Sequence, residues 1–230
     1  MHTRFIESTQ HPIAKHFTKL VHDKKYRYES KRVVVSCDKV IAEISKQVAP
    51  ITVLEGSAEV LKKITKLPTF TGMLAEFEMP LIEKFRDANR LLILDGISDP
   101  GNLGTLIRTA AALGFDAIYL LPSCVDPFND KALRSARAAP FFTKIYQGTY
   151  EEIADWKKRR NAPLYIATLE GKPLETFSFT APLSLALGNE SRGISKELQE
   201  MGTPVSIPMH AHIESFNVAV AGAIMMYAMR

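Results

Sequence analysis

The feature that most constrains the fold is a strand, a tight loop and a helix in direct succession at residues 91–120. These residues read LLILDGISDPGNLGTLIRTAAALGFDAIYL. Four apolar residues predict a buried strand, turn-forming residues follow, and a helical pattern opens at about residue 103. Asp99 is expected to start the turn, Gly101 to permit a positive φ and Asn102 to cap the helix.

The predicted helix start gathers backbone N–H groups that can hold an anion or a polar ligand. Arg108 follows on the same helix, among apolar neighbours such as Leu106 and Ile107. Two interpretations stay open from these residues alone. The loop is either part of a ligand site or a plain connection in a parallel sheet, with an arginine that extends to water.

The rest of the chain alternates short apolar strands with helical patterns, which is typical of an α/β protein. In the first part we expect a helix at 5–28 interrupted at Pro12, strands at 33–35, 51–54 and 73–77, and helices at 39–48 and 58–66. Later strands are expected at 117–121, 143–146, 164–168, 183–187 and 205–207, with helices at 130–139, 150–160 and from Ser215. Continuous apolar strands predict a parallel sheet covered on both faces.

A charged segment that contains Pro80 interrupts this alternation. We therefore predict a small α/β domain at residues 1–80, a linker at 81–90 and a larger parallel-sheet domain at 91–230. A chain of 230 residues, 46% of them apolar, is long enough to form a core in each.

The basic charge lies at the N-terminus. The whole chain carries a net charge of +4, whereas residues 1–32 hold eight Lys or Arg against three Asp or Glu, a net +5. The same segment contains His2, His11, His16 and His22 and the aromatics Phe5, Phe17, Tyr26 and Tyr28. This mixture suits RNA phosphates and exposed bases, but it is equally typical of a solvated amphipathic helix.

Several classes of protein are excluded or disfavoured. The sequence has no dinucleotide-binding GxGxxG, no P-loop lysine motif and no HExxH zinc motif. Cys37 and Cys124 stand 87 positions apart, which suggests neither a zinc site nor a disulfide framework, so we expect no bound metal. Without a secretory signal or a membrane-length apolar run, we expect a soluble, cytoplasmic protein with no membrane partner.

The C-terminal helix shows no polar face. Residues 218–229 are twelve consecutive apolar or small residues, too few to cross a membrane. We expect this helix to be buried partly against another subunit; the alternative is an internal core helix.

Three polar clusters follow buried strands, at residues 99–108, 188–193 and 208–217. Ligands bind outside the carboxyl ends of the strands in open parallel sheets, so we expect the three clusters to converge on one site. If each cluster were only a turn, Arg108, Glu190 and Asn217 would have no explanation.

At these clusters the sequence closely resembles the SpoU branch of the SPOUT class of RNA methyltransferases. The three family motifs are matched by DPGNLGTLIRTA at 99–110, LALGNESRGIS at 185–195 and VSIPMHAHIESFNVAVA at 205–221. Residues 5–27 more weakly resemble the small ribosomal-protein-like domain that binds substrate in some of these enzymes.

The resemblance implies methylation of a ribose 2'-hydroxyl in RNA, with S-adenosylmethionine as methyl donor. Ribosomal RNA is the first choice of substrate and transfer RNA the second, and no DNA binding is expected. The resemblance also implies a homodimer and a deep C-terminal trefoil knot, a rare feature that composition could not have indicated.

The same resemblance implies the site residues. The matched catalytic positions are Arg108, Asn102, Glu190, Ser215 and Asn217, and the matched donor-binding positions are Thr168, Gly188, Ile207 and Phe216. At Gly188 a missing Cβ is expected to let the adenosine approach the chain. His210 and His212 share a loop with the third motif but are not part of it.

Arg108 has two possible roles in this chemistry. The resemblance implies a general base, but an arginine side chain is almost always protonated in proteins. A charged guanidinium that grips a phosphate and stabilises the developing alkoxide is at least as plausible. Glu190 is expected to orient either Arg108 or the loops of the third motif, and a solvated turn carboxylate is the alternative.

The chain departs from the family pattern at several positions. Phe216 stands where leucine is usual, and Asn189 replaces a smaller residue with little expected effect. Residues 134–142 differ from the usual pattern of an RNA-facing loop, and Ser36 and Cys37 replace a Glu-Gly pair. Two other functions stay open: an inactive RNA-binding protein with this fold, and an unrelated α/β enzyme with another nucleotide cofactor.

Overall fold

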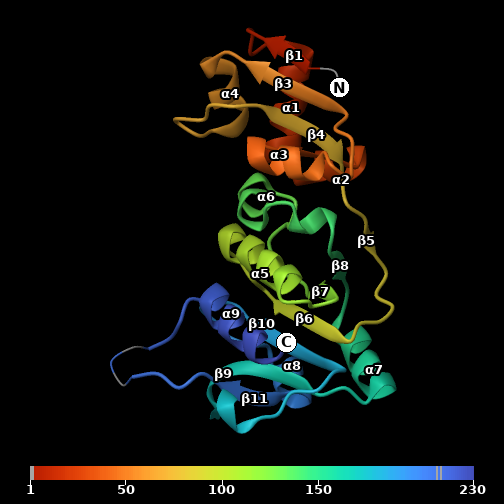
Figure 1. Cartoon of the computed structure of the whole chain (residues 1–230), viewed down its shortest axis with the longest axis vertical. Helices are drawn as coiled ribbons and strands as arrows, with labels where there is room; N and C mark the ends of the chain where they lie inside the picture. The colour runs from red at the N-terminus through yellow and green to blue at the C-terminus, as the bar shows by residue number, and fades with distance from the viewer. Residues whose placement is uncertain (1–2, 211, 213) are drawn as a thin grey trace. The chain divides into compact units, whose positions relative to one another are not determined.

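The computed structural model describes residues 3–210, 212 and 214–230, so His2 of the basic segment lies outside the described residues. The chain forms two compact units, shown with their elements in Figure 1. The first comprises Met1–Pro80 and Asp126–Phe141, and the second comprises Leu81–Val125 and Phe142–Arg230.

The N-terminal unit is a four-stranded sheet in the order β1-β3-β4-β2. Its strands are β1 (Thr3–Ile6), β2 (Arg32–Val35), β3 (Thr52–Gly56) and β4 (Leu74–Glu78). Its helices include α1 (Pro12–His22), α2 (Lys24–Ser30), α3 (Asp38–Ile44) and α4 (Ala58–Thr65). Strand β1 pairs in parallel with β3, whereas β4 runs antiparallel to both β3 and β2.

The prediction of one helix at residues 5–28 is wrong, because its first residues form a strand and the rest forms two helices. Phe5 belongs to the edge strand β1, and helix α1 begins only at Pro12, which occupies the first helical turn where a missing N–H costs nothing. Asp23 then ends α1 and caps α2, because its side chain accepts a hydrogen bond from the Tyr26 N–H.

Residues 126–141 pack with the N-terminal unit, although the predicted domains assign them to 91–230. This segment forms helix α6 (Asp130–Ala136) and a short 3-10 turn, η1 (Ala139–Phe141). Arg27 and Asp126 form a buried ion pair of 2.6 Å, with side chains only 4% and 6% exposed. A buried guanidinium requires such a partner, which explains why the segment joins this unit. The domain boundaries themselves stay a prediction.

The C-terminal unit is a seven-stranded parallel sheet in the order β11-β9-β10-β6-β7-β8-β5. Its strands are β5 (Ile82–Glu83), β6 (Arg90–Asp95), β7 (Ala117–Leu120), β8 (Lys144–Gln147), β9 (Leu164–Pro173), β10 (Leu183–Gly188) and β11 (Thr203–Ser206). The expected parallel sheet is confirmed, while β5 forms an edge strand inside the predicted linker.

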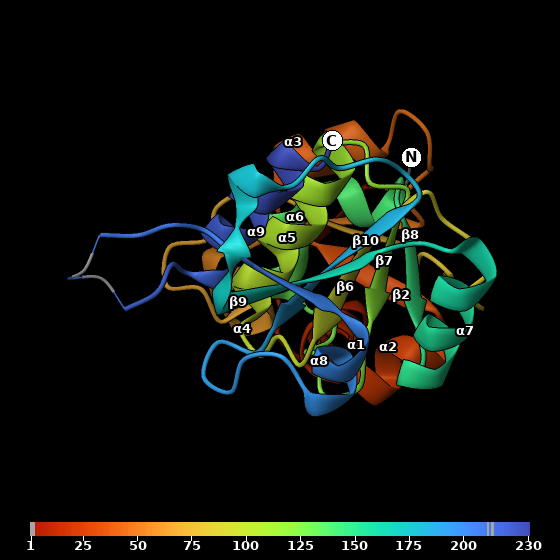
Figure 2. The same cartoon turned by 90° about the horizontal axis from the view of Figure 1, so that it is seen from below.

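Helices cover both faces of this sheet (Figure 2). Helices α5 (Pro100–Ala112) and α9 (Val218–Ala228) pack together on one face. Helices α7 (Tyr150–Arg160) and α8 (Lys196–Met201) pack together on the other, around the buried side chains of Trp156 and Leu198. The pattern of the sequence did not predict α8 or the 3-10 turn η2 (Leu174–Thr176).

Candidate functional site

The loop between β6 and α5 differs in detail from its prediction. Asp99, not Asn102, caps the helix: its Oδ1 accepts from the Asn102 N–H over 2.8 Å, and Pro100 begins the helix. The positive φ falls at Gly96 (φ 70°) rather than at Gly101. Because proline favours the first helical position, the cap lies three residues earlier than expected, which frees the Asn102 side chain for other contacts.

Glu190, in the loop after β10, binds the loop after β6 through both carboxylate oxygens. Oε2 accepts from the backbone N–H of Ser98 at 3.2 Å and from its hydroxyl at 2.9 Å. Oε1 accepts from Asn102 Nδ2 at 3.0 Å and from the Asp99 N–H at 3.3 Å. Glu190 lies in a turn and is exposed, but its four hydrogen bonds join the first and second motifs, which a turn carboxylate with only solvent contacts would not do.

Asn217 brings the third motif to the same place. Its Oδ1 accepts from the Ala219 N–H at 2.9 Å and so caps helix α9. Its Nδ2 donates to Asn102 Oδ1 over 3.0 Å. The three polar clusters are thus linked through Asn217, Asn102 and Glu190, and their predicted convergence is confirmed.

Asn189 has a larger structural role than expected. Its Nδ2 donates to the Gly96 carbonyl oxygen at 2.7 Å, and its Oδ1 accepts from the Ser191 and Arg192 N–H groups at 3.0 Å each. These bonds tie the loop after β10 to the loop after β6, a structural role that the expected small effect does not include. No local pattern of the sequence indicates this role, because Gly96 lies 93 positions before Asn189.

The hydrogen bonds around Glu190 also fix its charge. Burial alone would raise the pKa of this carboxyl group, but donors from Asn102 and Ser98, together with the backbone N–H of Glu190 itself, outweigh burial and lower the pKa below its ordinary value. Glu190 is therefore ionised at neutral pH, as an acceptor of four hydrogen bonds requires.

A pocket of about 1010 Å³ opens beside this network. Its lining residues come from strands β9, β10 and β11, the loops that follow β10 and β11, and helices α8 and α9. Seven of the nine predicted site residues line it: Thr168, Gly188, Glu190, Ile207, Ser215, Phe216 and Asn217. Asn102 lies outside the lining and is joined to it by hydrogen bonds to Glu190 and Asn217.

Thr168 shows that the pocket is suited to a polar ligand. Its Oγ1 is buried and has no hydrogen-bond partner among the described residues. A buried hydroxyl without a partner is unfavourable by about 1–3 kcal/mol, so such groups are few in folded proteins. The residues of the pocket fit a nucleoside-containing methyl donor, which offers both apolar surface and hydrogen-bonding groups.

The structure gives a reason for glycine at position 188 that does not depend on a ligand. A Cβ on this residue would lie 2.3 Å from the Gly193 carbonyl carbon and 2.5 Å from the Ile194 nitrogen. The loop closes onto the end of β10 through an isolated bridge between Asn189 and Gly193. The return of the chain onto β10 already excludes a side chain here, whatever ligand the pocket binds.

Arg108 stands apart from the other predicted site residues. It is exposed on α5, has no hydrogen-bond or ion-pair partner among the described residues, and is absent from the pocket lining. Glu190 does not orient it, because its carboxylate oxygens accept from Ser98 in the loop before α5 and from Asn102 in the first turn of α5. His210 and His212 are exposed, and neither is among the described residues that line the pocket.

Within the described ranges, no group of three or more His, Cys, Asp or Glu side chains could hold a metal ion. None of the helices described is long and apolar enough to cross a membrane.

The fold is that of an α/β protein with a parallel sheet, and its pocket lies beyond the carboxyl ends of the strands, where such proteins commonly bind ligands. Residues 89–227 match the model of the SpoU rRNA Methylase family, and the chain belongs to this family.

Two relatives and one solved structure illustrate the similarity. The chain is 35% identical over 176 residues to the 23S rRNA (guanosine(2553)-2'-O)-methyltransferase RlmP of Bacillus subtilis, covering 76% of the chain and 71% of the relative. It is 28% identical to the 23S rRNA (guanosine-2'-O-)-methyltransferase RlmB of Acinetobacter baylyi, covering 77% of each. The AdoMet-bound rRNA methyltransferase of Sinorhizobium meliloti superposes with a TM-score of 0.87 at 25% identity, covering 99% of this chain and 97% of that one.

Proposed function

We propose that this protein methylates the 2'-hydroxyl of a ribose in RNA, with S-adenosylmethionine as the donor and ribosomal RNA as the substrate. The observation that carries the proposal is the chain of hydrogen bonds from Glu190 through Asn102 to Asn217, which links two residues that line the pocket of about 1010 Å³. Membership of the SpoU family and the names of its relatives support the same reaction and the same class of substrate.

The chain's own groups would hold the donor and the acceptor in line. When bound, S-adenosylmethionine supplies an electrophilic methyl group on a sulfonium. The backbone near Gly188, Ile207 and Phe216 and the hydroxyl of Thr168 would bind the donor. The network around Asn102 would hold rigid the part of the site that faces the ribose hydroxyl. Alignment of donor and acceptor lowers the barrier of a transfer reaction by several kcal/mol.

Arg108 would act on the RNA rather than on the donor, because it lies outside the lining and its exposed guanidinium has no partner in the described chain. We assign it the phosphate next to the target ribose, where its planar fork would also stabilise the oxygen that loses its proton. Ser215 lines the pocket and is exposed, so its hydroxyl can reach an acceptor nucleotide.

The test is methyl transfer to separated RNA pools. The full chain is incubated with methyl-labelled donor and either ribosomal or transfer RNA, and bonds that become resistant to alkaline cleavage are mapped. Label in ribosomal RNA at a resistant bond supports the proposal. Label confined to transfer RNA favours the second substrate, and label on a base or in neither pool contradicts ribose methylation.

An inactive RNA-binding protein with this fold is the remaining alternative, and it predicts no donor binding by calorimetry. The buried unpartnered hydroxyl of Thr168 favours an active donor site, because a pocket that binds no polar ligand gains nothing from it.

We further propose a homodimer that covers helix α9. Val220, Ile224 and Tyr227 recur at helical spacing and are 47%, 37% and 57% exposed in the single chain. The opposite side of α9 is buried against α5, since a Cβ at Gly222 would lie 2.5 Å from Leu106 Cδ2. An exposed apolar stripe on a helix without a polar face is typical of an interface.

Three finer features complete the proposal. The N-terminal domain would bind RNA, the C-terminal domain would carry a trefoil knot, and the protein would work in the cytoplasm. The basic N-terminal segment supports RNA binding, and membership of the SpoU family supports the knot. The two free thiols, Cys37 and Cys124, suit a reducing compartment such as the cytoplasm.

A further inference from the structure

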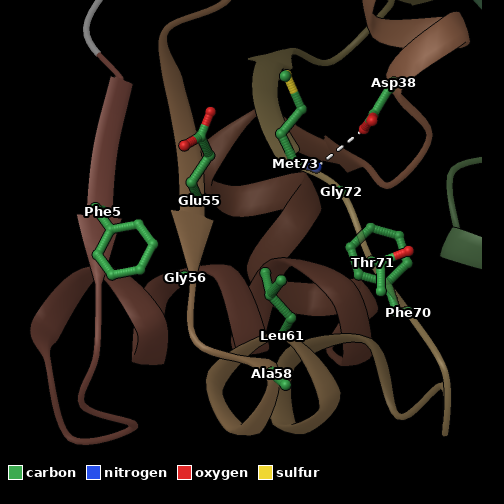
Figure 3. Close-up of a pocket in the computed structure, with 10 residues that line it drawn as sticks. All are labelled: Phe5, Asp38, Glu55, Gly56, Ala58, Leu61, Phe70, Thr71, Gly72 and Met73. Atoms are coloured by element: carbon green, nitrogen blue, oxygen red, sulfur yellow. Dashed lines mark hydrogen bonds between the residues drawn. The ribbon is translucent and has the colours of Figure 1, made fainter.

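The N-terminal unit has a pocket of its own, of about 350 Å³, which the proposed methyl transfer does not use. It lies where the parallel strands β1 and β3 end, beside the first turn of α4 and the loop that leads into β4 (Figure 3). All of its lining residues belong to this unit, so its shape is independent of the second unit.

Two side chains on neighbouring strands give this pocket its chemistry. Phe5 and Glu55 are paired in register across β1 and β3, so both project from the same face of the sheet. The Phe5 ring is 63% exposed, and the exposed Glu55 carboxylate has no hydrogen-bond or ion-pair partner within the described residues. The pocket therefore combines an open aromatic face with a free acceptor.

The opposite wall is held in place by Asp38. Its Oδ1 accepts from the Met73 N–H over 2.9 Å, the bond drawn in Figure 3. The loop approaches this carboxylate closely at Gly72 (φ 131°), where a Cβ would lie 2.7 Å from the same oxygen. Phe70 packs against the core of the unit beside this loop. Asp38 thus holds the loop before β4 in place through its hydrogen bond to Met73. Glu55 is therefore the carboxylate of this pocket that is available to a ligand.

The lining excludes some ligands. None of its described residues is a lysine or an arginine, and two are carboxylates, so a phosphate is disfavoured here. A flat, neutral group that carries hydrogen-bond donors fits the aromatic face and the acceptor together. Unpaired nucleobases are such groups, and proteins bind them by stacking and by contacts to their Watson–Crick edge.

We infer that this pocket binds an unpaired guanine of the RNA substrate, stacked on Phe5 with its N1–H and N2–H donors on the Glu55 carboxylate. Guanine is the base whose Watson–Crick edge offers two adjacent donors, matching the two oxygens of one carboxylate. The inference rests on the proposed function only in taking RNA as the ligand. It assigns this guanine to substrate recognition, separate from the methylated nucleotide.

The experiment measures binding of the full chain to fluorescent nine-residue RNAs that are uridine except for a central G, A, C or U. We expect the G oligomer to bind at least fivefold more tightly than the other three. Glu55→Gln should remove this preference. Phe5→Ala should weaken binding of the G oligomer by about fivefold or more, because the base can no longer stack on the ring. Phe5→Leu should resemble Phe5→Ala, because an apolar side chain without a ring cannot stack.

Glu43→Gln is the matched control, because Glu43 is an exposed carboxylate of the same unit outside the pocket lining. It changes the charge equally and should keep the preference for G. Both test positions are exposed, so melting temperatures of the variants should match the wild type and show that each one folds.

Equal binding of the four oligomers, or a preference that survives Glu55→Gln, overturns the inference. The inference is also overturned if Glu43→Gln loses as much of the preference for the G oligomer as Glu55→Gln does, because net charge would then explain the effect. The assay needs no methyl transfer, so absence of methylation with an intact preference for G would contradict the proposed function alone.

Discussion

Asn217 donates a hydrogen bond to Asn102 over 3.0 Å, although the two residues are 115 positions apart. Asn217 caps the last helix and Asn102 lies in the first turn of α5, so one bond fixes the starts of two helices that pack together. Glu190 extends this link to a third loop. Expected effects of substitution follow from these contacts.

Arg108→Lys should lower methyl transfer by at least a hundredfold, because a point charge cannot reproduce the planar fork of arginine. That factor corresponds to about 2.8 kcal/mol of transition-state stabilisation. Donor affinity and melting temperature should stay unchanged, since Arg108 is exposed and lies outside the pocket lining. Single-turnover kinetics and calorimetry check this, with Arg86→Lys as the exposed control. Near-normal transfer by Arg108→Lys would exclude both proposed roles.

Glu190→Gln should destabilise the protein by about 1 kcal/mol at pH 7, because a neutral amide binds the four donors less strongly than a carboxylate does. The folded state lowers the pKa of Glu190, so its stabilising contribution is present above the ordinary value of about 4.3 and is lost as pH falls through the folded value. Urea unfolding should therefore show the difference between wild type and variant persisting at neutral pH and shrinking as the pH falls below about 4.3. A constant difference over this range would contradict the assignment.

Thr168→Val should weaken binding of S-adenosylmethionine by about fivefold, the loss expected for one hydrogen bond. The donor-free protein should melt at the same temperature or slightly higher, because the change replaces a buried hydroxyl without a partner by a methyl group of similar size. Titration calorimetry and thermal melting measure the two effects. A lower melting temperature with unchanged affinity would show that Thr168 is purely structural.

Gly188→Ala should destabilise the fold by about 3 kcal/mol, because backbone atoms of Gly193 and Ile194 occupy the space of the new Cβ and cannot rotate away. Gly114→Ala is the matched control: its φ is 75° but nothing lies near the added carbon, so about 1 kcal/mol of backbone strain is expected. Chemical denaturation compares the two. If Gly188→Ala and Gly114→Ala lowered the free energy of unfolding equally, the loop after β10 would be able to move aside.

Ile224→Asp should convert a dimer into a monomer, since it buries a charge in the proposed interface. Ile51→Asp serves as the control, because Ile51 is exposed to a similar degree (38% against 37%) in the other unit. Sedimentation velocity over a range of concentrations distinguishes the two species. A wild-type chain that sediments as a monomer throughout would rule out the interface on α9.

The main features of the C-terminal unit could be predicted from the sequence because buried parallel strands are continuous apolar runs, as at Leu91–Leu94. The meeting of the three polar clusters followed from the same sheet rule. The cap at Asp99 was missed, because Asn102 is an equally good capping residue by type. The hydrogen bonds of Asn189 depend on loops far apart in sequence, and no local pattern reports them.

The N-terminal unit was harder to predict because its elements depend on distant partners. Thr3–Ile6 is a strand only because β3 offers it a parallel neighbour, and its residues alone do not distinguish a strand from the start of a helix. The position of residues 126–141 likewise depends on Arg27, a cation that the sequence alone groups with the basic surface.

The pairing of Arg27 with Asp126 has a consequence for dividing this protein into fragments. The chain leaves the N-terminal unit after Pro80 and returns to it at Asp126, so neither unit corresponds to one uninterrupted stretch of sequence. A fragment that starts at residue 81 would keep Asp126 and lose the guanidinium that neutralises it, together with the hydroxyl donor of Tyr28. If the chain were cut after residue 80, residues 126–141 would be expressed with the C-terminal fragment, although they pack with the N-terminal unit.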